Sequence, residues 1–508
     1  MNSKKIIFSI FATVFLLTSC EDDTETVDNT TLPPSAQAFV AEHVMGTLTY
    51  NFAISDDQAA STGTGTGVQY SWDFNGEATA VAPSGSHTFS SNGLKTVTLT
   101  VTTTALDGVT TLTDSYSMDM IVERSLYGDI TSDLDLDGDY VLSGQLQVRD
   151  GATLTIAAGS NIYALSDDGN GNAPAIIVWQ GGKIEAVGTA SDPIIMTSVI
   201  ARDEPDRLPI VGGRAWGGLI ICGYAPIQGG GTRTVEGVAS VPYGGRAIAP
   251  DNEINGITLA GVGSGTEVSY CEVAYNFDDG FEMFGGTVDL RYCMVYKVGD
   301  DAFDTDTGYQ GTGQFLVVVR GPNSNRGHEM DGRNSGQAAD DSFPKFSNVT
   351  IVGNNSGSSE DESLRLREGT AGHFQNYMLV DQQRRGFRAT NEDGNLDGTF
   401  VVNGSTPPSD DADGRYIWLD PLNVMDDVPT PATVAATDGT DPGANFTFNI
   451  QDGNTGVTES NLLPSTEFTG STPTEASMDA SATFVGALKA GYNDDAFDGW
   501  TVWSEESQ

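Results

Sequence analysis

Short runs of alternating apolar and polar residues, separated by glycine-rich turns, occupy most of this chain. Lys95–Val101 alternates cleanly, and Gly151–Ile156 and Gly182–Ala186 repeat the pattern further on. Alternation with a period of two is typical of half-buried β-strands, whereas no long segment has the 3.6-residue period of an amphipathic helix. We therefore predict an all-β protein of many short strands. At 508 residues it can hold one small module and one large one.

The first module is expected between residues 36 and 124. Tyr70–Gly76 ends in a turn, and His87–Phe89 and Lys95–Val101 flank Asn92-Gly93, which predicts a hairpin with one buried face. That face would consist of Trp72, Phe74, Phe89, Val97, Leu99 and Val101. The W-D-F-x-G core resembles that of polycystic-kidney-disease (PKD) domains, which are immunoglobulin-like sandwiches. The resemblance implies a spacer, or alternatively a weak glycan-contacting unit. We expect Asp73 to stabilise a turn and not to bind a ligand.

The second module begins near residue 125, where three short strands per coil, joined by tight turns, indicate a parallel β-helix. Ala152–Ile156, Gly181–Ala190 and Trp216–Ile221 contain the motifs ATLTI, GGKIEAVGTA and WGGLII. These resemble pectin-lyase-like β-helices of Bacteroidota surface proteins, many of which have no assigned activity. The resemblance implies a right-handed parallel β-helix over residues 125–400, and final coils, loops and a cap over residues 401–508.

An open end of a β-helix must be covered, because it exposes apolar side chains and unpaired backbone groups. The C-terminal region contains several large aromatic residues that could supply such a cover. We expect the last coil to be capped by Phe484, Phe497, Trp500 and Trp503.

A repeat of 22 positions supports the β-helix. One set of residues recurs 22 positions later: Cys271, Val273, Asp278, Asp279 and Phe281 reappear as Cys293, Val295, Asp300, Asp301 and Phe303. About 22 residues form one coil, so paired residues should stack on successive rungs roughly 4.8 Å apart. Cys271 and Cys293 would then be either a disulfide or two stacked free thiols.

Extending the repeat predicts adjacent columns of side chains. The inward column would be Phe281, Phe303, His328, Leu364 and Phe387. The next residue outward gives the column Glu282, Asp304, Glu329, Arg365 and Arg388, and two positions further lie Asp306, Asp331 and Arg367. Stacked carboxylates repel one another, so a cation or an arginine must neutralise them.

Three hypotheses account for the acidic column. It could be an exposed ladder neutralised by its own arginines, with Glu329 paired to Arg365. It could be a calcium site built from carboxylate oxygens, whose ligands would be Asp300, Asp301, Asp304 and Asp306, with Glu282 or Glu329 alongside. It could also be a glycan-active cleft.

The family resemblance specifies the enzymatic alternative. A polysaccharide lyase would use calcium together with an arginine base, for which Arg365 and Arg388 are the candidates. A glycoside hydrolase would use a carboxylate pair such as Asp300 and Asp301. The chain has neither a Gly-His-Gly nor an Arg-Ile-Lys motif, and we expect His328 to be a core residue. The catalytic pattern of the family is therefore not transferred to this chain.

Two other kinds of segment are candidate binding sites. Trp216, Tyr243 and Arg246 lie in or beside glycine-rich excursions, which predicts glycan contacts from residue type alone. Asp133–Asp139 begins like an EF-hand loop, but its twelfth position would be Gly144 instead of glutamate. We therefore expect a strand entry with exposed carboxylates there.

The N-terminus predicts export and lipidation. Two lysines and an apolar run are followed by Leu17-Thr18-Ser19-Cys20, which resembles a lipobox and implies a signal peptide over residues 1–19 and lipid on Cys20. Residues 20–35 are an acidic tether, similar to the surface-export signal of Bacteroidota lipoproteins. The expected location is the outer membrane, facing the exterior.

Charge and cysteine content narrow the partners. The chain has 24 basic and 70 acidic residues and a net charge of -46, which makes nucleic acid a poor partner. Three cysteines besides Cys20 argue against a disulfide scaffold and a zinc site. We predict a non-catalytic surface lipoprotein that binds glycan or a partner through calcium, as an accessory to a TonB-dependent outer-membrane protein. The alternatives are a calcium-dependent lyase or hydrolase, and a structural spacer or adhesin.

Overall fold

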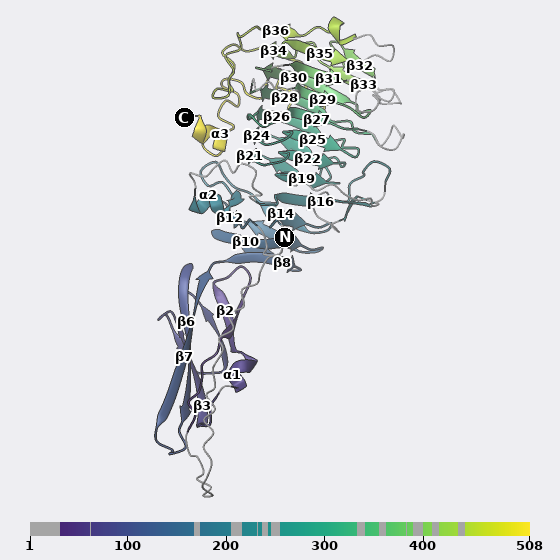
Figure 1. Ribbon diagram of the computed structural model, residues 1–508. Helices are drawn as coiled ribbons and strands as arrows, with labels where there is room; N and C mark the ends of the chain where they lie inside the picture. Colours follow the sequence, from purple (N-terminus) through teal and green to yellow (C-terminus); the bar gives the residue numbers. More distant parts are fainter. Residues whose placement is uncertain are drawn as a thin grey trace, which may run out of the picture. The chain divides into compact units, whose positions relative to one another are not determined.

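The computed structural model describes residues 31–60, 62–166, 173–204, 216–230, 232–235, 242–244, 255–332, 341–354, 362–382, 384–389, 400–408, 416–434 and 442–507. The chain divides into two compact units, Met1–Val44 with Leu48–Val122 and Met45–Thr47 with Glu123–Gln508 (Figure 1). In the described ranges no helix is both long and apolar enough to cross a lipid bilayer.

The smaller unit is a sandwich of two antiparallel sheets. One sheet contains β1 (Phe39–His43), β2 (Thr49–Ile54) and β5 (Ser84–Thr88), and the other contains β3 (Thr66–Phe74), β4 (Thr79–Ala80), β6 (Gly93–Thr104) and β7 (Thr111–Val122). A short helix, α1 (Asp56–Ala60), follows β2. All six residues predicted for the buried face lie in its core, so that prediction is confirmed.

The predicted hairpin across Asn92-Gly93 is wrong. Strand β5 pairs with β2, whereas β6 pairs with β3 and β7, so this connection joins the two sheets. Alternation identifies the buried face of a strand but not its partner, because both inner faces of a sandwich produce the same pattern. The turn role of Asp73 is confirmed, since its Oδ1 accepts a hydrogen bond from the backbone N–H of Gly76 at 2.7 Å.

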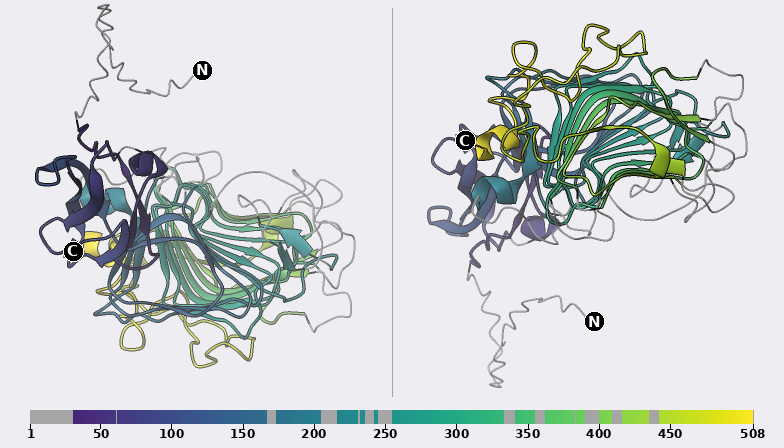
Figure 2. Two further views of the ribbon diagram at one scale, coloured as in Figure 1. Left: turned by 90° about the horizontal axis from the view of Figure 1, so that it is seen from below. Right: turned by 90° about the horizontal axis from the view of Figure 1, so that it is seen from above.

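The larger unit is a right-handed parallel β-helix, as predicted. The longest sheet contains β8 (Ser125–Ile130), β10 (Asp139–Val148), β12 (Asn161–Ala164), β13 (Ile176–Val178), β15 (Ile195–Ser198), β16 (Leu219–Cys222), β19 (Ile257–Ala260), β22 (Phe281–Phe284), β25 (Phe303–Asp306), β27 (Arg326–Met330), β29 (Glu362–Leu366), β31 (Arg385–Ala389) and β35 (Thr430–Val434). Figure 2 views this stack end-on, with the strands of successive coils overlying one another.

Two further parallel sheets complete the coils. The larger contains β20 (Glu267–Ser269), β21 (Glu272–Ala274), β23 (Asp289–Arg291), β24 (Met294–Tyr296), β26 (Thr312–Val319), β28 (Lys345–Val352), β30 (Gly372–Val380), β32 (Phe400–Asn403), β33 (Tyr416–Leu419), β34 (Val424–Asp426) and β36 (Asn449–Ile450). The smaller contains β9 (Leu134–Leu136), β11 (Thr153–Ile156) and β14 (Lys183–Ala186). Outside the coils, β17 (Thr232–Thr234) and β18 (Pro242–Gly244) form an antiparallel hairpin, and α2 (Val199–Asp203) follows β15.

The 22-residue repeat is confirmed by the register. Val273 lies opposite Val295 and Phe281 lies opposite Phe303 on neighbouring rungs. Cys271 and Cys293 also lie on neighbouring rungs, and both are free thiols. In the Asp133–Asp139 segment, residues 134–136 form β9 and the next strand begins at Asp139, which confirms a strand entry.

A column of residues with positive φ turns the chain at one corner of successive coils. Tyr270, Tyr292, Phe315, Asn348 and Asn376 have φ of 53°, 51°, 61°, 56° and 57°. This left-handed conformation is unfavourable for aromatic residues. Stacking offsets the cost, because the ring centroids of Tyr270 and Tyr292 are 4.7 Å apart and those of Tyr292 and Phe315 are 4.6 Å apart.

The C-terminal aromatics do not cap the last coil, so that prediction is wrong. Phe497 and Trp503 pack against Met294, Val317 and Met378 on the outer side of β24, β26 and β30. Figure 1 shows α3 (Val502–Glu506) beside β21 and β24, far from β36. The outward residues of these strands are apolar, and the returning chain removes them from water.

Other aromatic residues cover the described part of the final coils. Phe446 and Phe448 pack against the main core, and the ring of Phe448 stacks on that of Phe387 with centroids 5.6 Å apart. Ala432 lies opposite Phe387 in the register of β35. Because alanine is small, it leaves space into which Phe448 fits.

The returning segment should contribute measurably to stability. Trp503 is buried, and its Nε1 donates a hydrogen bond to the backbone carbonyl of Glu459 at 2.7 Å. We expect Trp503→Ala to lower the free energy of unfolding by about 3 kcal/mol, from lost burial and the cavity left behind. Urea unfolding would measure this, with Tyr224→Ala as the control because Tyr224 is 71% exposed. Equal midpoints for the two variants would contradict a stabilising role.

Glu272 should make the docking of this segment depend on pH. Its carboxylate accepts the backbone N–H groups of Val502 and Trp503, and burial raises its pKa from 4.5 to about 7. A raised carboxyl pKa means that stability is lost as pH rises from about 4.5 through 7. Relative to Glu272→Gln, we expect the wild-type unfolding free energy to fall by about 3 kcal/mol across this range. Urea unfolding at several pH values, with exposed Glu459→Gln as control, tests this; a pH-independent difference would contradict it.

Candidate functional site

The outward positions of the longest sheet carry a ladder of charged side chains. We call Glu282, Asp304, Glu329, Arg365 and Arg388 the outer ladder. Each lies opposite the next on consecutive rungs, from β22 through β25, β27 and β29 to β31. The predicted column is therefore confirmed, including the steps where coils are longer than 22 residues. The ladder is acidic at β22 and basic at β31.

The inward neighbours of the ladder are core residues. The rings of Phe281 and Phe303 stack with centroids 5.2 Å apart, and His328 follows on the next rung. His328 is fully buried, with its Nδ1 3.3 Å from the hydroxyl of Tyr377, and burial lowers its pKa to about 3. The imidazole is therefore neutral at physiological pH and faces away from the ladder, which agrees with the core role predicted for it.

Three carboxylates meet at the acidic end of the ladder. One oxygen of each of Asp279, Glu282 and Asp304 lies within 4.8 Å of those of the other two. We call these three residues the carboxylate cluster. Asp279 and Glu282 are buried and Asp304 is half-buried. An adjoining group at the same spacing contains Asp278, Asp279 and Asp300.

Among the described residues, no lysine or arginine forms an ion pair with Asp279 or Asp304 of the cluster. Burial raises the pKa of Asp279 and that of Asp304 well above the usual range, and neighbouring carboxylates add to both rises. Oδ1 of Asp304 is buried without a hydrogen-bond partner among the described residues. Glu282 accepts a hydrogen bond from the side-chain amide of Asn255. Two like charges this close are unfavourable unless a proton or a cation separates them.

The predicted calcium ligands do not form a single group. The structure brings Glu282 and Asp304 together, and it places Asp300 beside Asp278 and Asp279 instead. Asp301 forms an ion pair with Arg326 at 3.1 Å. Asp306 accepts a hydrogen bond from the backbone N–H of Thr307, and burial raises the pKa of its carboxyl.

The pairing predicted between Glu329 and Arg365 is wrong. Glu329 forms its ion pairs with Arg326 at 2.7 Å and with Arg367 at 3.2 Å, and Arg367 also contacts Asp331 at 2.5 Å. The ladder is also not an exposed surface, because Glu329 is buried and Arg365 is 0% exposed. These pairs lie on the outward side but are buried or half-buried, so losing one partner is costly.

The basic end of the ladder surrounds one carboxylate. Arg385 and Arg388 contact the fully buried Glu362 at 2.7 Å and 3.0 Å. Burial lowers the pKa of Arg388, and the nearby Arg365 and Arg385 act in the same direction, whereas Glu362 opposes it. Arg365 and Arg388, the bases considered for a lyase, are thus next to each other but not beside the carboxylate cluster.

Two of the remaining predicted site residues lie among the described residues. Trp216 is half-buried and packs against the core of the first coils, and Tyr243 lies on β18. Cys20 and Arg246 lie outside the described residues. Asp278 and Asp279 were not predicted as ligands, although the 22-residue repeat contains both.

The role of Arg326 had no sequence signal. Arg326 precedes the outer ladder on β27. The rung containing it begins after an insertion that breaks the spacing of 22. Only the folded register places it beside Asp301 and Glu329.

The carboxylate cluster fits a hard divalent cation. Its donors are all carboxylate oxygens, and calcium takes six to eight oxygen ligands in flexible geometry. Such an ion would satisfy the buried Oδ1 of Asp304, which has no hydrogen-bond partner in the part of the chain that the structure describes. Asp304 and Asp300 keep part of their surface exposed, so water or a ligand could supply further oxygens.

Comparison with known families agrees with the two architectures. The model described as a pectate-lyase-like beta helix domain matches residues 128–252 and 241–410, and a PKD domain model matches residues 32–119. No curated protein and no solved structure matches the chain.

The buried ion-pair network generates one prediction. Arg326→Ala should lower the free energy of unfolding by about 3 kcal/mol, because Asp301 and Glu329 would remain buried without their shared guanidinium. Lys489→Ala, which removes an exposed pair with Glu467, should cost less than about 1 kcal/mol. Urea unfolding of both variants checks the contrast. Similar small losses would show that Arg326 is not needed to neutralise the ladder.

Proposed function

The chain belongs to the pectate-lyase-like β-helix family, and from that premise we propose that it is a non-catalytic, calcium-dependent glycan-binding protein of the cell surface. In this proposal the carboxylate cluster of Asp279, Glu282 and Asp304 holds the ion. Oxygen atoms of the glycan complete its coordination shell. The combination of a β-helix with a PKD domain fits a cell-surface or carbohydrate-related protein.

One observation carries the proposal. Among the described residues, Asp279 and Asp304 have no ion pair, and Oδ1 of Asp304 is buried without a hydrogen bond. Their neighbours on the same face differ, since Asp301 has Arg326 and Asp331 has Arg367. A divalent cation would do at the cluster what arginine does at the next rungs, namely remove the repulsion between stacked carboxylates.

The cellular part of the proposal rests on the N-terminal sequence. Lipid on Cys20 would anchor the chain in the outer membrane, and the acidic tether supports exposure to the exterior. An accessory role beside a TonB-dependent outer-membrane protein is included in the proposal on the lipoprotein resemblance alone.

The chemistry of the ladder favours binding over catalysis. A lyase needs a group that can take a proton beside the cation. Arg388 contacts Glu362, and it lies three rungs from β25, beyond β27 and β29. His328 is in the core and points away from the ladder. A lyase remains the alternative, and it would reveal itself by unsaturated products from acidic polysaccharides.

Calcium should stabilise the chain if the cluster holds it. We expect the melting temperature of a soluble form that begins after Cys20 to rise with calcium and to fall back in chelator. An ion that binds only the folded state adds about 2.7 kcal/mol at a hundredfold excess over its Kd. Asp279→Asn and Asp304→Asn should each abolish the rise, since each removes a charged ligand. Differential scanning calorimetry measures the effect.

The matched control is Asp135→Asn, because Asp135 is an exposed carboxylate on β9. This variant should keep the full calcium response. A response that is absent in the wild type, or retained in both cluster variants, would reject the calcium site. Glycan binding in calcium without turnover would support the binding function. Release of unsaturated product would instead make the chain a lyase.

A further inference from the structure

In the first coils, strand β10 contains a β-bulge, which lies apart from the outer ladder of charged residues. Strand β10 pairs with β8 through Leu142 opposite Leu126, and pairing resumes with Leu146 opposite Gly128. Three residues of β10, Ser143–Gln145, therefore face the single residue Tyr127. Such bulges bend a strand and redirect its side chains, and they are frequent beside binding sites.

Among the described residues, Ser143–Gln145 also have no paired residue on the next rung. Strand β12 pairs with β10 only as far as Leu142, and β13 begins to pair at Leu146. In the described part of the chain, Ser143–Gln145 therefore interrupts the backbone pairing of β10 with the rungs on both sides. The hollow at this interruption is open to solvent and has a volume of about 390 Å³.

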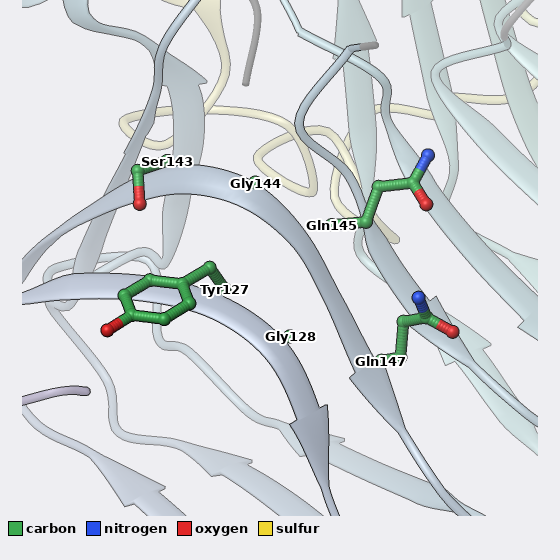
Figure 3. Close-up of a pocket in the computed structure, with 6 residues that line it drawn as sticks. All are labelled: Tyr127, Gly128, Ser143, Gly144, Gln145 and Gln147. Carbon is green, nitrogen blue, oxygen red and sulfur yellow. The ribbon is translucent and has the colours of Figure 1, made fainter. Parts of the chain in front are cut away.

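The hollow is lined by uncharged groups. Its residues are Tyr127, Gly128, Ser143, Gly144, Gln145 and Gln147. Figure 3 shows Tyr127 and Ser143 at one end of the bend and the two glutamines at the other. An uncharged lining stands out in a chain of net charge -46.

The hollow presents both aromatic surface and polar side chains. Tyr127 is 38% exposed, and Gln145 makes no side-chain hydrogen bond within the described residues. Oε1 of Gln147 accepts a hydrogen bond from Nε1 of Trp179 at 3.0 Å, which orients the amide and leaves its nitrogen as a donor. A Cβ at Gly144 would lie 3.2 Å from that of Tyr127, so glycine keeps the two strands close.

The adjacent charges neutralise each other. Arg149 forms an ion pair with Asp129 at 2.8 Å, and its guanidinium lies 3.9 Å from the centre of the Trp179 ring. A charged ligand in the hollow would therefore lose hydration without gaining a counter-ion. Hydroxyl and amide groups both donate and accept hydrogen bonds, as the hydroxyls of a sugar do.

We propose that this hollow is a binding site for a neutral saccharide that does not require calcium. Tyr127 offers its ring to the sugar, and Ser143, Gln145 and Gln147 bind the hydroxyls. The site lies on β8 and β10, and strands β13, β16 and β19 separate it in the sheet from the carboxylate cluster on β22 and β25. The chain would then contact a glycan at two places along one face.

Isothermal titration with neutral trisaccharides tests the site. The probes are cellotriose, maltotriose and mannotriose, added to the chain beginning after Cys20 in the presence of chelator. We expect saturable binding of at least one probe, weakened at least about tenfold by Tyr127→Ala and by Gln145→Ala, which corresponds to about 1.4 kcal/mol each. Ser143→Trp should abolish binding by filling the hollow. Gln69→Ala, an exposed glutamine of the sandwich, should leave it unchanged.

The outcomes separate this site from the calcium function. No binding of any probe to the wild type would overturn the proposal, as would binding that all three hollow variants retain. Unchanged melting temperatures of the variants would exclude unfolding as the cause of a loss. Because the titration is done in chelator, a negative result leaves the calcium proposal standing, and a failed calcium response leaves this site standing.

Discussion

In-register stacking of each coil on the next is the constraint from which the rest of this structure follows. The parallel register places Phe281 on Phe303, with ring centroids 5.2 Å apart, and Glu282 on Asp304. Stacking like on like is favourable inside the helix, where apolar groups leave water together. On the outside of the β-helix the same stacking is unfavourable when the stacked residues carry charges of the same sign. The core and the ladder are therefore two consequences of a single spacing.

The outer face resolves that conflict in two ways along the stack. At β27 and β29, arginines lie between the carboxylates, with Arg326 shared by Asp301 and Glu329, and with Arg367 beside Asp331. At β22 and β25 the carboxylates of Asp279 and Asp304 meet without such a partner among the described residues, and their pKa values rise. The second arrangement is where an external cation has most to contribute, since burial magnifies the repulsion it would remove.

The stack also determines where the chain must deviate from regular pairing. A left-handed residue turns successive coils at one corner from Tyr270 to Asn376, and aromatic stacking offsets its cost at Tyr270, Tyr292 and Phe315. The apolar outer side of β24, β26 and β30 requires cover, and the C-terminal segment supplies it. In the first coils the bulge at Ser143–Gln145 instead leaves a hollow open. The apolar outward residues thus account for the cover, and the bulge accounts for the opening.

The sequence by itself determined the two architectures, the buried face of the sandwich and the register of the ladder, because alternation and a 22-residue period are local properties of the chain. It did not determine partners. The residues flanking Asn92-Gly93 joined different sheets, Glu329 paired with Arg326 and Arg367, and the C-terminal aromatics lay along the coils. Only the tertiary structure decided these contacts, since the insertion before Arg326 and the path of the returning C-terminal segment set distances that no sequence spacing encodes.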